Sequence, residues 1–217
     1  MTRKLTLLSV VAALTLLFCA TAGATDILYT TLGPNGEYDT GSGYFVDGSN
    51  YFNQVLALPF TPSQSETMVD AVLALGNYAG NNNPVSVYLE TDNGGMPGTV
   101  LASLTQQGVI PPFSSGGGLV TFNCNSCGTV NSGTQYWVVA AETDPNTEQA
   151  WMWAYNDQQG HGAFNQLGSI NGPWSQYDST ISGFRVDSGG VPEPGTFVML
   201  GSGILAAAAG LRRKLGL

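Results

Sequence analysis

Long apolar runs stand near the two ends of the 217-residue chain, whereas apolar and polar residues alternate over short distances between them. One run extends from Leu5 to Ala20 and the other, rich in small residues, from Thr196 to Leu211. The residues between form short runs of Val, Thr, Tyr, Phe and Trp that are separated by Gly, Asn and Pro and show no helical period. This pattern is typical of strands joined by turns. It predicts an all-β body between two apolar terminal segments.

Strands are predicted wherever these β-rich runs occur. They cover Ile27–Thr31, Asn53–Phe60, Thr67–Leu75, Val85–Glu90, Val100–Thr105, Leu119–Phe122, Gln135–Glu142, Ala150–Tyr155 and Ile181–Val186. The segments between them are rich in Gly and Asn, which tolerate the left-handed backbone that turns need. Strands at this spacing favour a single β-sandwich with jelly-roll-like connections over a βαβ fold. We therefore expect one β-sandwich domain over residues 25–188.

The N-terminal segment, residues 1–24, has the organisation of a secretory signal peptide. The basic Met1–Lys4 precedes the apolar run, and Ala22-Gly23-Ala24 follows it with small residues where signal peptidase requires them. A signal helix that is later removed is predicted, with cleavage after Ala24 or, as an alternative, after Ala22. Cys19 leaves a lipoprotein signal as a further alternative, although Phe18 stands where that processing needs a small residue.

The C-terminal segment, residues 189–217, consists of three parts. Gly189-Gly190 and Val191-Pro192-Glu193-Pro194-Gly195 come first, the apolar run follows, and Arg212, Arg213 and Lys214 come after it. The run is a little shorter than the ~20 residues of a full membrane span. Cations directly after such a run hold that end in the cytoplasm. A C-terminal transmembrane helix that anchors the protein is therefore one interpretation.

These three parts, in this order at the end of the chain, resemble the PEP-CTERM sorting signal of Gram-negative bacteria. The resemblance covers Val191 to Lys214. In that family an exosortase-type membrane protease recognises the Pro-Glu-Pro segment, removes the tail, and releases or re-attaches the protein at the cell surface. The resemblance implies signal peptidase and an exosortase-type protease as partners. It also implies a transient inner-membrane anchor, followed by a place on the cell surface or in the extracellular matrix.

The body carries a second resemblance, which rests on short segments in a fixed order. The segments are Leu28-Tyr29, Gln54–Thr61, Val69–Leu75, Val85–Leu89, Gly95–Leu101 and Gly133–Val139. Together they are similar to the choice-of-anchor β-sandwich domains, most of all the R type, that precede PEP-CTERM or other surface anchors. That family has no established catalytic residues. The resemblance implies a surface-displayed domain whose anchor is exchangeable.

The charge of the body excludes whole classes of partner. Arg185 is its single cation, because the other five Lys and Arg residues lie in the terminal segments. Almost all of the acidic residues lie in the body, so the mature domain is more acidic than the net charge of −9 of the full chain suggests. Nucleic-acid binding needs clustered Lys and Arg, so nucleic acid is not expected as a partner.

An acidic surface of this kind attracts divalent cations without a dedicated site. Asp47-Gly48-Ser49-Asn50 and Asp92-Asn93-Gly94-Gly95 offer oxygen ligands beside glycine, as calcium loops do. Neither has the spacing of a recognised calcium motif, and Asp or Asn next to Gly is common turn chemistry. Turns are the favoured interpretation, with Ca²⁺ as the alternative, and no cofactor is expected.

Two cysteines remain after removal of the signal segment. Cys124 and Cys127 follow a predicted strand as Cys-Asn-Ser-Cys. In an oxidising compartment the simplest prediction is a disulfide that closes a tight loop. A redox-active pair would need a helix N-terminus, and a zinc site would need two further ligands, while the sole histidine, His161, is distant in sequence.

An aromatic row stands at Trp151, Trp153 and Tyr155. Side chains two residues apart in a strand share a face, so these three rings are predicted to lie side by side. An exposed row of this kind would stack on the apolar faces of sugar rings. The alternative is packing in the core, where large aromatic side chains supply much of the buried area. The sequence favours the core and leaves a glycan platform open.

Catalytic motifs are absent from the sequence. Glu90 with Asp92, or Glu142 with Asp144, could be paired as glycosidase carboxylates, but nothing in the sequence sets their separation. A catalytic triad would have to use His161, which lies between two glycines with no nucleophile elbow nearby. We therefore expect no enzyme activity.

Two functional hypotheses follow from the sequence. The first is an exported, exosortase-processed protein with a structural or adhesive role in exopolysaccharide or biofilm. The second is a carbohydrate-binding module that uses Trp151, Trp153 and Tyr155 on extracellular polysaccharide. A secreted hydrolase is a third and weaker hypothesis.

Overall fold

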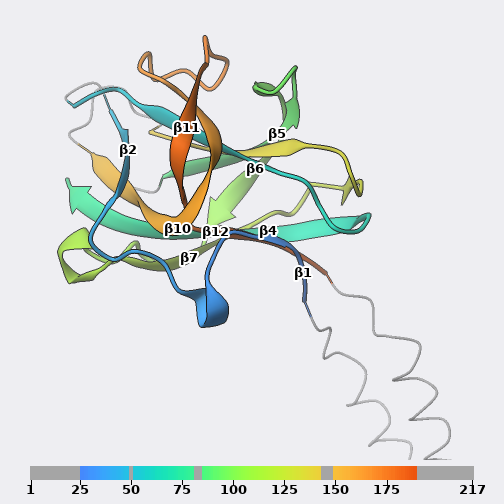
Figure 1. Cartoon of the computed structure of the whole chain (residues 1–217), viewed down its shortest axis with the longest axis horizontal. Coiled ribbons are helices and arrows are strands. Elements are labelled where there is room, and N and C mark those ends of the chain that lie inside the picture. The colour runs from blue at the N-terminus through green and yellow to red at the C-terminus, as the bar shows by residue number, and fades with distance from the viewer. Residues whose placement is uncertain (1–24, 49–50, 81–84, 143–148, 190–217) are drawn as a thin grey trace, which may run out of the picture. The chain divides into compact units, whose positions relative to one another are not determined.

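The β-rich runs of the body form one network of antiparallel strands in the computed structural model (Figure 1). The structure describes residues 25–48, 51–80, 85–142 and 149–189. Its strands are β1 (Asp26–Thr30), β2 (Gly43–Asp47), β3 (Val55–Phe60), β4 (Glu66–Ala79), β5 (Ser86–Asp92), β6 (Pro97–Gln106), β7 (Gly118–Asn123), β8 (Thr129–Val130), β9 (Tyr136–Ala141), β10 (Ala150–Asn165), β11 (Ser175–Ser182) and β12 (Phe184–Ser188). In the described ranges, helical turns are limited to two short 3₁₀ segments, Pro34–Gly36 and Phe113–Ser115. The prediction of an all-β fold is confirmed.

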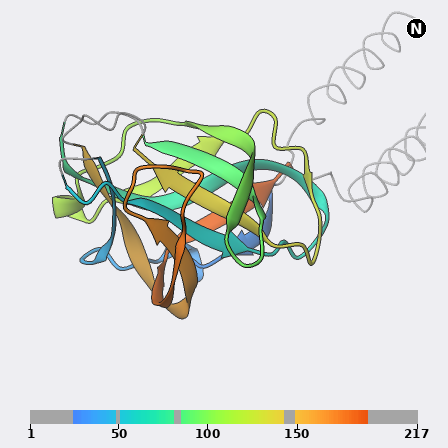
Figure 2. The same cartoon turned by 90° about the horizontal axis from the view of Figure 1, so that it is seen from above.

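The long strand β10 joins two groups of strands. Its first part, Ala150–Ala154, pairs with β2 on one side, and residues 150–153 pair with β4 on the other. Its second part pairs with β11 and β3 after a register shift between Tyr155 and Gln159, and shifts of this kind bend a strand. The pairings thereby close a ring of strands in the order β4, β7, β6, β5, β9, β3, β10 and back to β4. In Figure 2 the β10–β11 hairpin, in orange, projects from the other strands.

The two-sheet, jelly-roll detail of the prediction is not confirmed, because the pairings join all twelve strands of the described chain. The sequence also missed β2, β8 and most of β11, and it ended β10 at Tyr155 instead of Asn165. The missed part of β10 contains Asn, Gln, Asp, His and two glycines, so it lacks the apolar alternation that marks a strand. It is extended because it pairs with β11 from Gln159 to Phe164 and with β3 at residues 163–165.

The predicted signal helix and C-terminal transmembrane helix lie outside the described residues. Within the described part of the chain, no helix has the length and apolar character needed to cross a membrane.

The main hydrophobic core is enclosed by these strands, and two smaller clusters lie on their outer faces. In β3, Leu56 and Leu58 belong to the main core, whereas Val55 and Ala57 belong to the second cluster. The second cluster also contains Trp137 of β9. Both faces of β3 and β9 are therefore covered, and all six residues of β9 are buried. Burial of apolar surface is the main source of stability in such a layer. It contributes about 25 cal/mol for each Å² removed from water.

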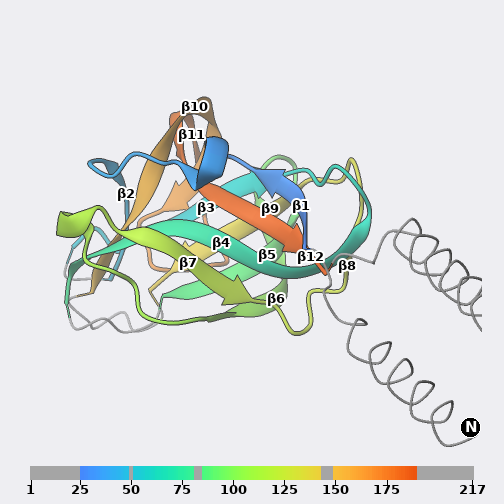
Figure 3. The ribbon, with the colours of Figure 1, turned by 90° about the horizontal axis from the view of Figure 1, so that it is seen from below.

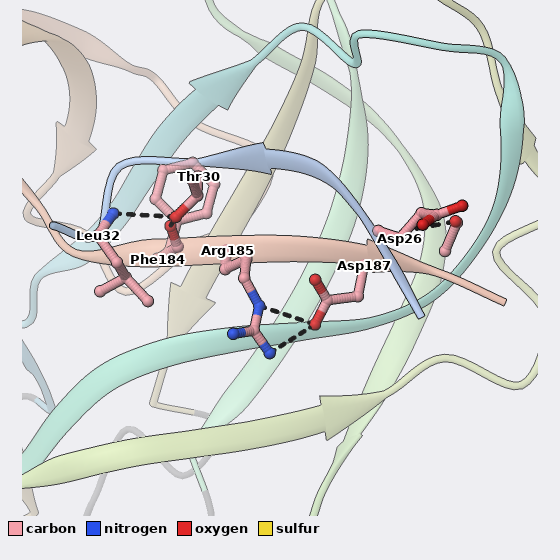
Figure 4. Close-up of polar contacts among 7 residues, drawn as sticks. Asp26, Thr30, Leu32, Phe184, Arg185 and Asp187 are labelled. Carbon is pink, nitrogen blue, oxygen red and sulfur yellow. Dashed lines mark hydrogen bonds and ion pairs between the residues drawn. The ribbon is translucent and has the colours of Figure 1, made fainter. Parts of the chain in front are cut away.

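The two ends of the body meet in neighbouring strands. Asp26 of β1 pairs with Ser188 of β12, and Figure 3 shows the blue β1 beside the orange β12. On its other side β12 pairs with β4, where Ser188 lies opposite Met68. Close by, the Arg185 guanidinium contacts the Asp187 carboxylate at 2.8 Å (Figure 4). The chain thus enters and leaves the domain at the same place.

Candidate functional site

The structure separates the members of the predicted aromatic row. Trp151 and Trp153 are both 0% exposed and belong to the main core. The Trp153 indole N–H donates to the Gly183 carbonyl at 3.0 Å, and its ring lies 6.0 Å from that of Phe184. Because this part of β10 is a central strand, the face that carries both tryptophans is covered by the core. The hypothesis of a solvent-facing row at Trp151 and Trp153 is therefore wrong, and only Tyr155 is partly exposed.

Tyr155 belongs instead to a cluster of three tyrosines from different strands. Its ring lies 4.7 Å from that of Tyr44 in β2, edge to face, and Tyr44 lies 4.9 Å from Tyr177 in β11. Burial, with a further contribution from the neighbouring Tyr44, raises the pKa of Tyr155 to about 12. Burial likewise raises the pKa of Tyr177, whose hydroxyl has no hydrogen-bond partner among the described residues. Tyr155 and Tyr177 are therefore neutral at physiological pH.

A groove of about 270 Å³ lies beside this cluster, and we call it the tyrosine groove. It is lined by Tyr44, Gln54, Leu56, Phe164, Gln166 and Tyr177. Tyr177 also packs near Phe164, with 6.2 Å between the ring centroids. The groove thus combines aromatic surface with the amide groups of two glutamines. This is the chemistry that a sugar needs, because its C–H face packs on an aromatic ring and its hydroxyls bond to amides.

Two glycines near the tyrosine groove stand where there is no room for a side chain. A Cβ atom on Gly162 would lie 2.4 Å from the Tyr177 hydroxyl oxygen. A Cβ atom on Gly43 would lie 2.5 Å from the carbonyl oxygen of Trp153, in the strand that pairs with Tyr44. The sequence gave no sign of the groove, because its lining residues come from strands that are distant in the chain.

The two predicted Asp-Gly turns use their carboxylates within the protein. Asp92 accepts hydrogen bonds from the Trp137 indole N–H at 2.8 Å, from Gln135 at 2.7 Å and from the Gly95 N–H at 3.1 Å. Slight burial raises the pKa of Asp92, but these hydrogen bonds outweigh that effect and lower the pKa below its ordinary value. Asp47 accepts from the Gln54 N–H at 2.8 Å, and burial raises its pKa.

Cation sites are not evident in the described residues. None of the described His, Cys, Asp and Glu residues form a group of three or more that could hold a metal ion. In the predicted loop Asp47-Gly48-Ser49-Asn50, the last two residues lie outside the described residues.

The structure does not place the carboxylates of Glu90 and Asp92 in one shared, accessible site. Glu90 is 0% exposed and neither of its side-chain oxygens has a hydrogen-bond partner among the described residues. Burial raises its pKa to about 7. Asp92, two residues further along β5, is exposed and already engaged by its donors. Glu142 is buried, and Asp144 lies outside the described residues.

Cys124 and Cys127 form a disulfide in the segment between β7 and β8, with their Cα atoms 5.6 Å apart. Cys124 belongs to the main core and Cys127 packs against it. The bond therefore ties the chain to the core between β7 and the two-residue strand β8.

Comparison with known families finds a match in the C-terminal tail. Residues 190–214 match the family profile of the PEP-CTERM protein-sorting motif. The match spans Val191, Pro192, Glu193, Pro194, Arg212, Arg213 and Lys214, which lie outside the described residues. A PEP-CTERM tail implies export, membrane anchoring through the C-terminus and processing by an exosortase. No curated protein matches the chain. The resemblance of the body to choice-of-anchor domains stays a prediction.

Proposed function

We propose that this protein is an exported surface or matrix protein, processed by an exosortase-type protease, with a structural or adhesive role in exopolysaccharide or biofilm. The PEP-CTERM match at residues 190–214 carries the proposal. The pairing of Asp26 with Ser188 supports it, because both terminal segments join the body at one place. Removing them would leave the paired strands β1 and β12 whole. The proposed role is non-catalytic.

The intact mass of the native protein tests this proposal, combined with mapping of its terminal peptides. The protein is isolated from cell-surface and extracellular fractions. We expect a chain that begins near Thr25 and ends between Pro192 and Gly195. A Glu193→Ala variant is expected to keep its tail, whereas Ser202→Ala, a change elsewhere in the tail, is expected to be processed. If residues 196–217 stay attached in the unaltered protein, the tail is a plain anchor and the proposal fails.

A second candidate function is sugar binding, and the tyrosine groove is the observation that favours it. This moves the predicted glycan contact from the buried Trp151 and Trp153 to Tyr44, Phe164 and Tyr177. The groove presents aromatic surface and amides but no charged side chain.

Retardation of the native protein in gels that contain a soluble glucan tests this candidate. We expect Tyr44→Ala to reduce the retardation, because it removes one wall of the groove. Tyr51→Ala serves as the matched control, since Tyr51 is exposed but does not line the groove. Equal retardation of both variants and the unaltered protein would exclude the tyrosine groove as a sugar contact.

A further inference from the structure

A second groove, of about 640 Å³, lies between the β5–β6 hairpin and the segment that leads into β11. It is lined mainly by Asp92, Asn93, Met96, Thr99, Asn171 and Trp174. We call it the Trp174 groove. Met96 and Trp174 pack against the second cluster, whereas Tyr44, Phe164 and Tyr177 pack against the main core. The two grooves are therefore separate, and the Trp174 groove has the size of a small-molecule or oligosaccharide site.

Trp174 is held in place by the local backbone. Gly172 has a φ of +78°, and a Cβ atom there would lie 2.9 Å from the Trp174 ring. A residue with a side chain would therefore be strained and would also push the indole away. One side of the indole packs on the cluster that contains Trp137. Packing on this cluster restricts the indole before any ligand arrives, and such restriction reduces the entropy cost of binding.

Trp174 is also the tryptophan that solvent can reach. The chain has four tryptophans, and Trp137, Trp151 and Trp153 are all 0% exposed. Trp174 is half-buried. Its indole N–H is a hydrogen-bond donor at the groove that Trp174 lines. Trp174 thus differs from the other three tryptophans, which are enclosed.

The turn between β5 and β6, which also lines the groove, is held by several hydrogen bonds. Asp92 accepts hydrogen bonds from Trp137, Gln135 and Gly95, and the Asn93 N–H donates to the Met96 carbonyl at 2.8 Å. These bonds fix the carboxylate and lower its pKa, so it stays ionised at neutral pH. The exposed side-chain amides of Asn93 and Asn171 stand at the same groove with both donors and acceptors.

The charges around the groove limit the kind of ligand. A fixed carboxylate stands at the rim, and no cation lines the groove. Arg185, the single cation of the body, is engaged by Asp187 in β12. An acidic polysaccharide would meet uncompensated repulsion here, whereas an uncharged sugar would not.

We propose that the Trp174 groove binds an uncharged polysaccharide, with one sugar ring stacked on the Trp174 indole. The amides of Asn93 and Asn171 and the Trp174 indole N–H bond to its hydroxyls, and Asp92 repels acidic chains. This inference rests on the adhesive role proposed above and names its ligand class. The site differs from the tyrosine groove in position, in residues and in having a charged rim.

Intrinsic fluorescence tests this inference, because a ligand in the groove contacts the accessible tryptophan. The native protein is titrated with two neutral polysaccharides, dextran and laminarin, and with alginate as the acidic comparison. We expect a saturable change in emission with at least one neutral polysaccharide and none with alginate. No change with either neutral polysaccharide, or an equal change with alginate, would overturn the inference.

Variants separate this groove from the tyrosine groove. We expect Trp174→Ala to weaken the affinity for the glucan, as measured by retardation, about tenfold, because loss of an aromatic stacking contact has an effect of this size. Trp174→Phe should restore most of the retardation but lose the fluorescence change. Leu167→Ala is the control, because Leu167 is exposed in the same connecting segment but does not line the groove. Urea unfolding midpoints equal to that of the unaltered protein establish that each variant is folded.

The outcomes distinguish this inference from the function on which it rests. If Trp174→Ala binds as well as the unaltered protein while Tyr44→Ala does not, the ligand lies in the tyrosine groove. The inference is then wrong, and the adhesive role stands. If the mature termini are unprocessed, the sorting proposal fails whatever the glucan result.

Discussion

Glu90 shows at the scale of one residue how burial can oppose stability. It lies in β5 between Trp137 of β9 and Val100 of β6, fully buried and without a hydrogen-bond partner among the described residues. A charge in such a place is costly, so the protonated form is favoured and the pKa rises to about 7. The pKa of Asp70 is raised in the same direction, to about 6, by burial and by the neighbouring Asp187, while Arg185 partly opposes the shift.

These shifts predict that stability falls as the pH rises. A carboxyl group whose pKa is higher in the folded state than in the unfolded state contributes most to stability when the pH is below its unfolded pKa. This contribution is lost as the pH rises from the unfolded pKa through the folded pKa. For Glu90 the loss extends from about pH 4.5 to above pH 7 and amounts to about 3 kcal/mol. We expect Glu90→Gln to flatten the dependence of the unfolding free energy on pH, as measured by urea denaturation from pH 4 to 8.

The control for this prediction is Asp178→Asn, which changes an exposed carboxylate of β11. It should leave the slope of stability against pH unaltered. A slope that is equally steep in Glu90→Gln would mean that Glu90 is not the group responsible.

Strand β10 decides the arrangement at the scale of elements. Its first part carries Trp151 and Trp153 into the core, and its second part carries Phe164 to the tyrosine groove. Strand β2 follows the first part closely: Gly43 pairs with Ala154, and Tyr44 pairs with Trp153. The two backbones approach so closely at Gly43 that a side chain there would collide with the backbone of β10.

Gly43→Ala is predicted to displace β2 from β10. The new Cβ atom would lie 2.5 Å from the Trp153 carbonyl oxygen and 2.9 Å from the Ala154 Cα, and neither backbone atom can move aside easily. We expect a loss of roughly 1–3 kcal/mol in the free energy of unfolding, as overpacking typically costs. Gly41→Ala is the matched control, since its nearest contact would be at an ordinary 3.4 Å. A loss of equal size in both variants would contradict this explanation.

At the scale of the whole molecule, the described body is one compact unit, Asp26–Ser188, whose ends are paired with each other. This arrangement suits a domain that is made with removable segments at both ends, because neither segment interrupts the sheet. The acidic character of the body suits an exported protein in another way. Self-repulsion keeps copies of such a domain soluble, and it leaves uncharged polymers as the partners that the surface repels least.

Some features of the site could be predicted from the sequence because neighbouring residues encode them. The turn at Asp92 and the aromatic residues near Trp174 were visible as local patterns. Their meeting in one groove was not, because they are about 80 residues apart in the chain. The Asp92 carboxylate likewise owes its state to Trp137, 45 residues away. Alternation correctly placed Trp151 and Trp153 on one face, but it cannot tell which face is covered.

The sequence by itself determined the β class, the acidic body, the closely spaced cysteine pair and the PEP-CTERM tail. Each depends on composition or on residues close together in the chain. The tertiary structure alone decided the ring of strands, the burial of the tryptophans and the position of both grooves. These depend on β10 pairing with strands from both ends of the body. A strand becomes central or exposed through such distant partners, and no local pattern records them.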